Sequence, residues 1–252
     1  MNYSSPHASF RTRCDQCSIH NRAICSRASS AAAQELQSLS RIRKFSAGQV
    51  ILGERQPGGF LGNVVSGMVK LCKTLEDGRQ QVVGLLFPSD FFGRPFEDAA
   101  PFSFEAATDV EICVFERQAF ESLLAQYPEV EHELLVQVLT ELDAAREWMV
   151  LLGCQTAREK VASFLLMLLR RSNLMGCEKA GKPETQIVTF PVSRKDVALY
   201  LGTTPETVSR QIQWMSRNDI LTIIDAQTFA ITDVHRLAQT AAHEEWLDQL
   251  SA

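Results

Sequence analysis

Three cysteines stand in close succession near the amino terminus. Cys14, Cys17 and Cys25 follow the spacing Cys-x2-Cys-x7-Cys, whereas the other four of the seven cysteines are scattered, and two of these, Cys154 and Cys177, have no predicted role. In a reducing compartment, closely spaced thiols bind metal or carry out redox chemistry more often than they form disulfides. The spacing therefore predicts a site for a metal or an iron–sulfur group, which prefers soft sulfur ligands.

A cuboidal iron–sulfur cluster takes four soft ligands, so a fourth must come from outside this segment. Cys113 alternates along a predicted strand with the apolar Ile112 and Val114, and it is therefore not required as a core residue. Cys72 shares its predicted strand face with polar neighbours and remains an alternative. Two further alternatives are a zinc site completed by His20 or Cys113, and a tail without any ligand.

A second group of residues suited to binding chemistry lies near the carboxyl terminus. Glu206, Ser209 and Arg210 stand at positions i, i+3 and i+4 of a predicted helix and so share one face. Arginine can pair with guanine O6 and N7, glutamate can accept from cytosine N4, and serine can meet a base or a phosphate. A surface Glu–Arg pair is the alternative explanation. Thr204 and Arg217 complete the predicted set of DNA contacts.

Local signals place this face on a helix-turn-helix. Ser193 predicts the start of a short helix and Gly202 predicts its end. Thr204 followed by Pro205 predicts the start of a second helix, whose first turns would enter the major groove of DNA. Two short apolar stretches between residues 220 and 231 then predict a two-stranded wing.

A long helix is predicted upstream of this unit, over residues 129–154. Its apolar positions are 3, 4, 3, 4 and 3 residues apart, which is typical of a coiled-coil seam. Pairing with a parallel copy would set Glu141 at a g position opposite Arg146 of the other chain. Packing against the same chain is the alternative. The predicted dimer seam consists of Leu135, Val138, Leu142, Ala145, Met149 and Leu152.

Glycines punctuate the middle of the chain. Nine of the thirteen lie between Gly48 and Gly93, interleaved with short apolar stretches. This spacing predicts consecutive short strands, with a hairpin turn at residues 76–79. Further strands between residues 103 and 115 precede a short helix over 117–125.

These elements predict an α+β chain with an N-terminal double-stranded β-helix (jelly-roll) sensor domain, a long dimerisation helix and a C-terminal winged helix-turn-helix. The predicted divisions are 1–30 for a cysteine-rich cluster-binding segment, 31–128 for the β-roll sensor domain, 129–154 for the dimerisation helix, and 155–252 for the DNA-binding domain.

Composition narrows the possible classes of function. The 252 residues include 25 Lys and Arg against 30 Asp and Glu, a formal charge of -5, so nucleic-acid binding must be confined to one surface. The apolar runs are too short to cross a membrane and the amino terminus does not read as a secretory signal. We therefore expect a cytoplasmic protein without a membrane partner. Because no paired nucleophile and base and no Gly-x-Ser-x-Gly motif occurs, we expect no enzyme.

From Cys14 to about Val234, the order of these parts resembles the cyclic-AMP receptor protein superfamily. The motif Glu206-Thr207-Val208-Ser209-Arg210 is similar to that of its fumarate–nitrate reduction regulator (FNR) branch. The resemblance implies a homodimeric transcription factor that binds double-stranded DNA and contacts RNA polymerase. It also implies a TTGAT-type palindromic site, in which Arg210 and Glu206 address the G·C pair and Ser209 the neighbouring thymine.

The FNR branch further implies one oxygen-labile 4Fe-4S cluster per subunit, with Cys113 as the fourth ligand beside Cys14, Cys17 and Cys25. Molecular oxygen would be the signal, because an intact cluster would favour pairing of the seam helices and its loss would weaken pairing. Ala145 in the seam is small and neutral, so we expect some dimer to persist without the cluster. The seven residues between Cys17 and Cys25 exceed the interval in the best-known pattern.

The cyclic-nucleotide pocket of the superfamily is not expected in this chain. That pocket needs a Gly-Glu pair and an arginine followed by Ser or Thr, whereas this chain has Gly93-Arg94 and, in place of the arginine, Glu105. We therefore expect no cyclic nucleotide. Two alternatives to the oxygen-responsive regulator remain: a regulator of the same superfamily that senses through zinc, haem or thiol oxidation, and a metal or redox module that does not bind DNA.

Overall fold

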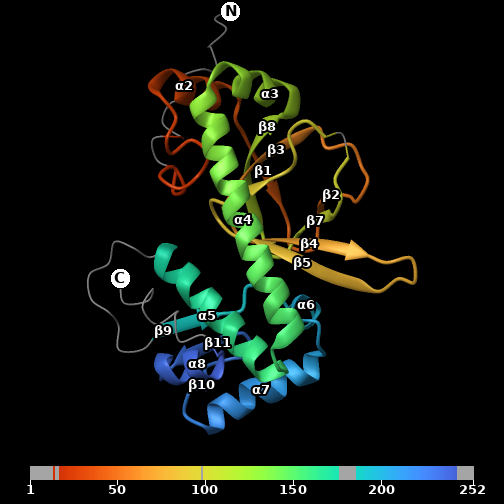
Figure 1. The fold of residues 1–252 in the computed structure, drawn as a ribbon, viewed down its shortest axis with the longest axis vertical. Helices are drawn as coiled ribbons and strands as arrows, with labels where there is room; N and C mark the ends of the chain where they lie inside the picture. Colours follow the sequence, from red (N-terminus) through yellow and green to blue (C-terminus); the bar gives the residue numbers. More distant parts are fainter. Residues whose placement is uncertain (1–13, 15–16, 98, 176–185, 243–252) are drawn as a thin grey trace, which may run out of the picture. The chain divides into compact units, whose positions relative to one another are not determined.

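The computed structural model describes Cys14 and residues 17–97, 99–175 and 186–242 (Figure 1). Cys177, most of the segment before Cys17 and most of the stretch between residues 172 and 186 lie outside the described residues. The chain divides into two compact units, residues 1–145 and 146–252. The division falls within one long helix, α4 (Pro128–Cys154).

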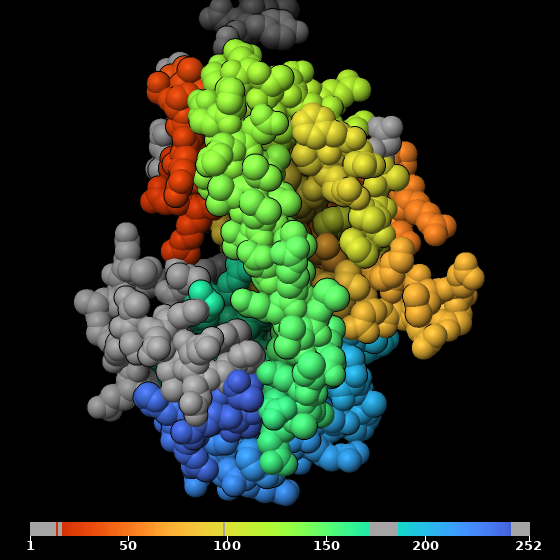
Figure 2. All heavy atoms as spheres, viewed as in Figure 1, coloured from red at the N-terminus to blue at the C-terminus, as the bar shows by residue number. Residues whose placement is uncertain are grey.

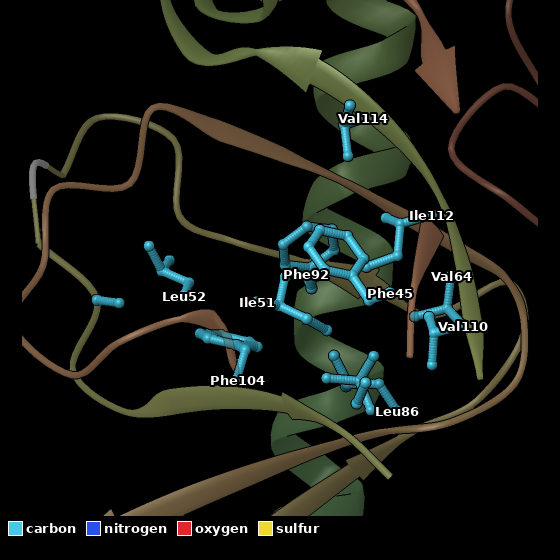
Figure 3. Close-up of a cluster of buried hydrophobic side chains, with 13 residues drawn as sticks. Phe45, Ile51, Leu52, Val64, Leu86, Phe92, Phe104, Val110, Ile112 and Val114 are labelled. Carbon is cyan, nitrogen blue, oxygen red and sulfur yellow. The ribbon is translucent and has the colours of Figure 1, made fainter. Parts of the chain in front are cut away.

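The first unit contains the predicted β roll, built from two four-stranded antiparallel sheets. The strand order is β1-β8-β3-β6 in one sheet and β2-β7-β4-β5 in the other. Apolar side chains from both sheets meet between them, including Phe45, Phe92 and Phe104 (Figure 3). The strands are β1 (Arg41–Phe45), β2 (Val50–Leu52), β3 (Phe60–Ser66), β4 (Val69–Thr74), β5 (Gln80–Leu86), β6 (Phe91–Phe92), β7 (Ser103–Ala106) and β8 (Val110–Glu116).

Two glycines show why this region needs residues without side chains. Gly78 takes a φ of +84° in the turn between β4 and β5, so the predicted hairpin is confirmed. Gly62 lies in β3 against β8, where an added Cβ would stand only 1.9 Å from the carbonyl oxygen of Cys113. The close approach of β3 to β8 therefore depends on glycine at this position.

Strand β8 separates two apolar clusters. Val110, Ile112 and Val114 point into the core between the sheets. Cys113 and Phe115 point to the opposite face, where they meet a second cluster formed with helices. The alternation predicted for Cys113 is therefore confirmed, since successive side chains of a strand point to opposite faces.

The second cluster is built by three helices: α2 (Ser30–Leu39), α3 (Arg117–Gln126) and the first turns of α4. The helix predicted over 117–125 corresponds to α3. It begins at Glu116, whose carboxylate accepts hydrogen bonds from the N–H groups of Gln118 and Ala119. Helix α2 was not predicted; it begins at Ser29, which accepts from Ala32.

The second unit is the predicted winged helix-turn-helix. It comprises α5 (Ala157–Met175), β9 (Gln186–Thr189), α6 (Arg194–Leu201), α7 (Pro205–Arg217), β10 (Leu221–Ile223), β11 (Thr228–Ile231) and α8 (Val234–Thr240). The wing is a sheet of three strands, in the order β10-β11-β9, instead of the two predicted. The added strand, β9, pairs with β11 over its whole length.

Candidate functional site: a recognition helix and a cysteine cluster

The recognition helix α7 begins as the sequence predicts. Gly202 ends α6 in the left-handed conformation, with a φ of +59°. Thr204 then caps α7, its hydroxyl accepting from the N–H of Thr207 at 3.2 Å, and Pro205 occupies the first turn. Val208, Ile212 and Met215 are buried under the helix. The opposite face is thereby held toward solvent.

The predicted DNA-reading residues lie on that outer face. Glu206, Arg210 and Arg217 are exposed and Ser209 is half-buried. The pKa of Glu206 is lowered by its own backbone N–H, by the hydroxyl of Thr204 and by the charge of Arg210. Glu206 therefore stays an anion, and hence an acceptor only, at neutral pH. Arg210 presents a fork of donors one turn along.

One residue near this helix was missed by the sequence reasoning. Arg158, in the first turn of α5, stacks over the ring of Trp214 at 3.7 Å from its centroid. Its Nε also donates to Gln211 Oε1 at 3.3 Å. The start of α5 is itself fixed by a capping box, in which Thr156 N–H donates to Glu159 Oε2 at 2.7 Å. Arg158 thus contacts α7 through two of its residues. No local signal in the sequence pairs Arg158 with Trp214.

The four predicted cysteine ligands share one neighbourhood. The pKa of Cys25 is raised to about 11, first by burial and then by the charges of Cys17 and Cys14. The pKa of Cys113 is raised to about 12, first by burial and then by the charges of Cys14, Cys17 and Cys25. Cys25 and Cys113 also pack against the same apolar cluster. The fold therefore brings together thiols that are far apart in sequence.

The thiols converge without forming a closed cage. Within the described ranges, no group of three or more His, Cys, Asp or Glu side chains stands ready to hold a metal ion. Tight turns carry the amino-terminal thiols, with Cys17 N–H donating to Cys14 O at 3.2 Å. His20 Nδ1 lies 3.9 Å from Cys25 Sγ. The donor set of four sulfurs suits a soft iron–sulfur group, which would draw these thiols inward and displace their protons.

The other described cysteines occupy different surroundings. Cys72 is buried on β4, in the sheet that does not contain Cys113, with its Sγ 3.9 Å from Glu105 Oε2. Cys154 is exposed at the end of α4.

The predicted seam of α4 faces solvent in the single chain. Leu135, Leu142 and Met149 are 54%, 42% and 72% exposed, and Val138 and Ala145 are exposed as well. Figure 2 shows the atoms of α4, in green, uncovered on the face in view. The alternative interpretation, that these positions pack against the same chain, is therefore wrong. Leu152 differs: it is half-buried, and its Cδ2 lies 3.9 Å from where a Cβ on Gly202 would stand.

Three apolar residues outside the predicted seam are also exposed on α4, and so are the predicted cross-chain partners Glu141 and Arg146. The additional apolar residues are Val136, Leu139 and Val150. The apolar strip is thus wider than a strict two-position seam.

A small pocket of about 10 Å³ lies in the roll, lined in part by Leu52, Phe60 and Phe104. A space of this size admits about one water molecule. Glu105 does not point into it, because its neighbours Phe104 and Ala106 take the inward positions of β7. Instead Glu105 Oε2 lies 3.4 Å from Lys70 Nζ. In the described part of the chain, no helix has the length and apolarity to span a membrane.

A β roll followed by a long helix and a winged helix-turn-helix defines a class of transcription regulators that bind DNA through the second helix of the motif. The sequence matches two families: the cyclic nucleotide-binding domain over residues 42–127, and the Crp-like helix-turn-helix domain over residues 159–240. The chain belongs to the Crp/Fnr family, and its relatives within that family include regulators of the FNR branch. It is a DNA-binding regulator and not an enzyme.

Similar proteins match most of the chain. The transcriptional activator protein FnrL of Cereibacter sphaeroides is 40% identical over 92% of this chain and 93% of its own length. The nitrogen fixation regulation protein FixK of Bradyrhizobium diazoefficiens is 36% identical over 84% of this chain and 86% of its own. The solved structure of FixK2 from Bradyrhizobium japonicum matches with a TM-score of 0.71 and 30% identity, covering 80% of this chain and 96% of that one.

Proposed function

We propose that this protein is an oxygen-responsive transcriptional activator whose 4Fe-4S cluster promotes homodimerisation and binding to a TTGAT-type palindrome. The observation that carries the proposal is that half-buried Cys25 and Cys113 pack against the same apolar cluster, where the charges of Cys14, Cys17 and Cys25 also raise the pKa of Cys113. Four soft donors in one half-buried place are the ligand set of such a cluster. The relatives named as activators support the direction of the response.

Cys14, Cys17, Cys25 and Cys113 would hold the cluster, which when bound would supply the reactivity toward oxygen. The chain itself performs the remaining steps. Residues of the segment around Cys25 pack with α2 and the start of α4, so ligation at the cysteines would help to order that segment. An ordered segment favours the paired form of α4 because it stabilises that form more than the single chain.

Pairing buries the exposed strip of α4 and presents two copies of α7. Their Arg210 and Glu206 side chains read the G·C pairs of two half-sites, about one helical turn apart. Two copies are needed, because a chain with a charge of -5 gains little affinity from general attraction to phosphate. Contact of the exposed 76–79 turn with RNA polymerase stays a prediction from the family resemblance.

The test is anaerobic purification followed by iron and sulfide analysis and a visible spectrum before and after exposure to air. We expect about four irons per chain, a brown chromophore, and bleaching in air. Cys113→Ala should abolish iron uptake, whereas Cys72→Ala and Cys154→Ala should retain it. If Cys72→Ala abolishes uptake and Cys113→Ala does not, the proposed ligand set is wrong.

Zinc is the second candidate, and the 3.9 Å approach of His20 Nδ1 to Cys25 Sγ is the observation that favours it. A zinc site of three cysteines and one histidine would give a colourless protein with one zinc per chain. His20→Ala distinguishes the two, because it removes a zinc ligand and leaves four thiols for iron.

A further inference from the structure

Polar contacts join the cysteine segment to the first turns of α4. Arg27 Nε lies 3.4 Å from Glu133 Oε2, and Ser29 Oγ donates to Glu129 Oε1 at 2.7 Å. Glu129 and Glu133 are four residues apart, so they present neighbouring carboxylates on one face of the helix. Both partner residues follow Cys25 within four positions. The third cysteine and the start of α4 are thus joined through very few residues.

Of these contacts, the ion pair at Glu133 involves a carboxylate whose burial is energetically unfavourable. Its side chain is only 11% exposed, and Oε2 accepts no hydrogen bond within the described part of the chain. A buried carboxylate is tolerated where an opposite charge lies close, and removal of that charge destabilises the surrounding structure. Arg27 is the nearby cation, and its side chain is 74% exposed.

The two ends of this pair are therefore held differently. Glu133 is fixed by burial on α4. Arg27 is not fixed by burial, and its position depends on the chain that leads to it from Cys25. Arg27 is therefore the end of the pair whose position would change with the order of the segment around Cys25.

Apolar packing runs beside this ion pair. Ile24 and Leu36 pack in the same cluster as Val130 and Leu134 of α4. Leu134 directly precedes Leu135, the first exposed residue of the predicted seam. One turn of α4 thus carries both a residue that packs against the cysteine segment, Leu134, and a residue of the predicted seam, Leu135.

We propose that Arg27 and Glu133 are positioning residues that couple the ordering of the cysteine segment to pairing of two chains at the seam of α4. The proposal rests on the proposed function, because it names the link between its two sites. With the segment ordered, Arg27 neutralises Glu133 and the first turns of α4 are stable. With the segment loosened, Glu133 is a buried charge without its cation, and those turns are destabilised. By linkage, the contact changes dimer affinity by the same factor as dimerisation changes the order of the segment.

Two substitutions should act from opposite directions. Arg27→Glu removes the cation in both states, so the loaded protein should dimerise as weakly as the unloaded one. Glu133→Gln removes the buried charge, so the unloaded protein should dimerise nearly as well as the loaded one. Each should reduce the ratio of unloaded to loaded dimer dissociation constants by about fivefold or more. The double reversal, Arg27→Glu with Glu133→Arg, should restore much of the ratio.

The experiment uses the full chain, reconstituted anaerobically with iron and sulfide or left unloaded, with dimerisation measured by sedimentation. Arg22→Glu and Glu131→Arg are matched controls, because they make similar charge changes at exposed positions of the same two segments. Hydrogen exchange of residues 129–137 gives a readout independent of dimerisation. It should quicken in Arg27→Glu and not in Arg22→Glu.

The outcomes separate the two proposals. A wild-type chain that takes up no iron and sulfide overturns the proposed function and, with it, this link. Normal uptake in Arg27→Glu and Glu133→Gln, together with a ratio as large as in the controls, overturns the link alone. A reduced ratio accompanied by lost iron would also overturn it, because the residues would then be needed to build the site and not to transmit its state.

Discussion

Trp148 stacks on Tyr200, with ring centroids 4.1 Å apart and ring planes inclined by 15°. Trp148 belongs to the last turns of α4, and Tyr200 to α6, the first helix of the helix-turn-helix. Phe164 of α5 meets the ring of Tyr200 edge-on, with centroids 5.8 Å apart. The end of α4 is therefore part of the DNA-binding unit, joined to it by a small aromatic core.

Trp148→Ala should lower the free energy of unfolding of this unit by about 3 kcal/mol, because it removes a large ring from the packed stack. Trp148→Phe should cost only about 1 kcal/mol, since it keeps a ring and removes an indole N–H that donates no hydrogen bond among the described residues. Urea denaturation followed by circular dichroism measures both. Glu147→Ala, at an exposed neighbouring position, is the control and should change stability by less than about 0.5 kcal/mol. Equal stability of the Trp148→Ala and Glu147→Ala variants would contradict the role of the stack.

Arg210→Ala should weaken binding to a TTGAT-type palindrome by about 1–3 kcal/mol and remove discrimination at the G·C pair, because a bidentate contact is lost. Arg217→Ala should instead weaken binding to all sequences alike and reduce the slope of log affinity against log salt by about 1, as expected of a phosphate contact. Fluorescence anisotropy with matched and G·C-substituted duplexes distinguishes the two. Retained discrimination in Arg210→Ala would show that another side chain reads this base pair.

Leu142→Glu should weaken dimerisation about 100-fold or more, because pairing would bury an uncompensated charge. The single chain should stay folded, since Leu142 is exposed in it. Thr140→Glu places the same charge at an exposed position outside the seam and should leave dimerisation nearly unchanged. Sedimentation of both variants measures the difference, and an equal loss in both would argue against the seam.

Gly62→Ala should destabilise the roll by about 3 kcal/mol or more, because the new Cβ would collide with the backbone of Cys113. Displacement of that backbone should also reduce iron uptake. Gly84→Ala is the matched control: it lies in β5, where an added Cβ meets Leu71 at an ordinary 3.7 Å. Iron content and thermal unfolding of the two variants check the prediction. Uptake equal to that of the Gly84→Ala variant would show that β8 can shift without harm to the cysteine site.

Ser29→Ala should raise the pKa of Glu129. The pKa is now lowered, chiefly because Ser29 donates a hydrogen bond to the charged carboxylate. This bond stabilises the folded chain above the ordinary carboxyl pKa, and its contribution is lost as the pH falls through the lowered pKa. A carbon-13 NMR titration of Glu129 measures the shift. Ser38→Ala, which removes a serine that bonds only locally at Glu35 O, should leave that titration unchanged.

The helix-turn-helix was predictable because its signals are local. Ser193, Gly202, Thr204 and Pro205 act on the turn in which each stands, so sequence alone places both helices. The roll was predictable as a class for the same reason, through glycine-punctuated strands and the turn at Gly78. The order in which its strands pair was not predictable, because that order depends on contacts between strands far apart in the chain.

The remaining features had no local signal. Strand β9 consists of only four residues and is recognisable only by its pairing with β11. The proximity of Cys25 to Cys113 depends on tertiary contacts between segments far apart in the chain. Glu133 reads in the sequence as one of several acidic residues on an exposed helix, and only the fold shows that it is buried beside Arg27. The seam was predicted from its spacing, but its last member, Leu152, packs partly within its own chain.

Strand β8 has an asymmetry with a mechanical consequence. Its inner face, with Val110, Ile112 and Val114, lies in the packed apolar core between the two sheets. Packed protein interiors are nearly incompressible. We expect a change of volume around Cys113 to act first on the outer cluster, whose side chains come largely from α2, α3 and α4, because Cys113 packs against that cluster and not against the core between the sheets.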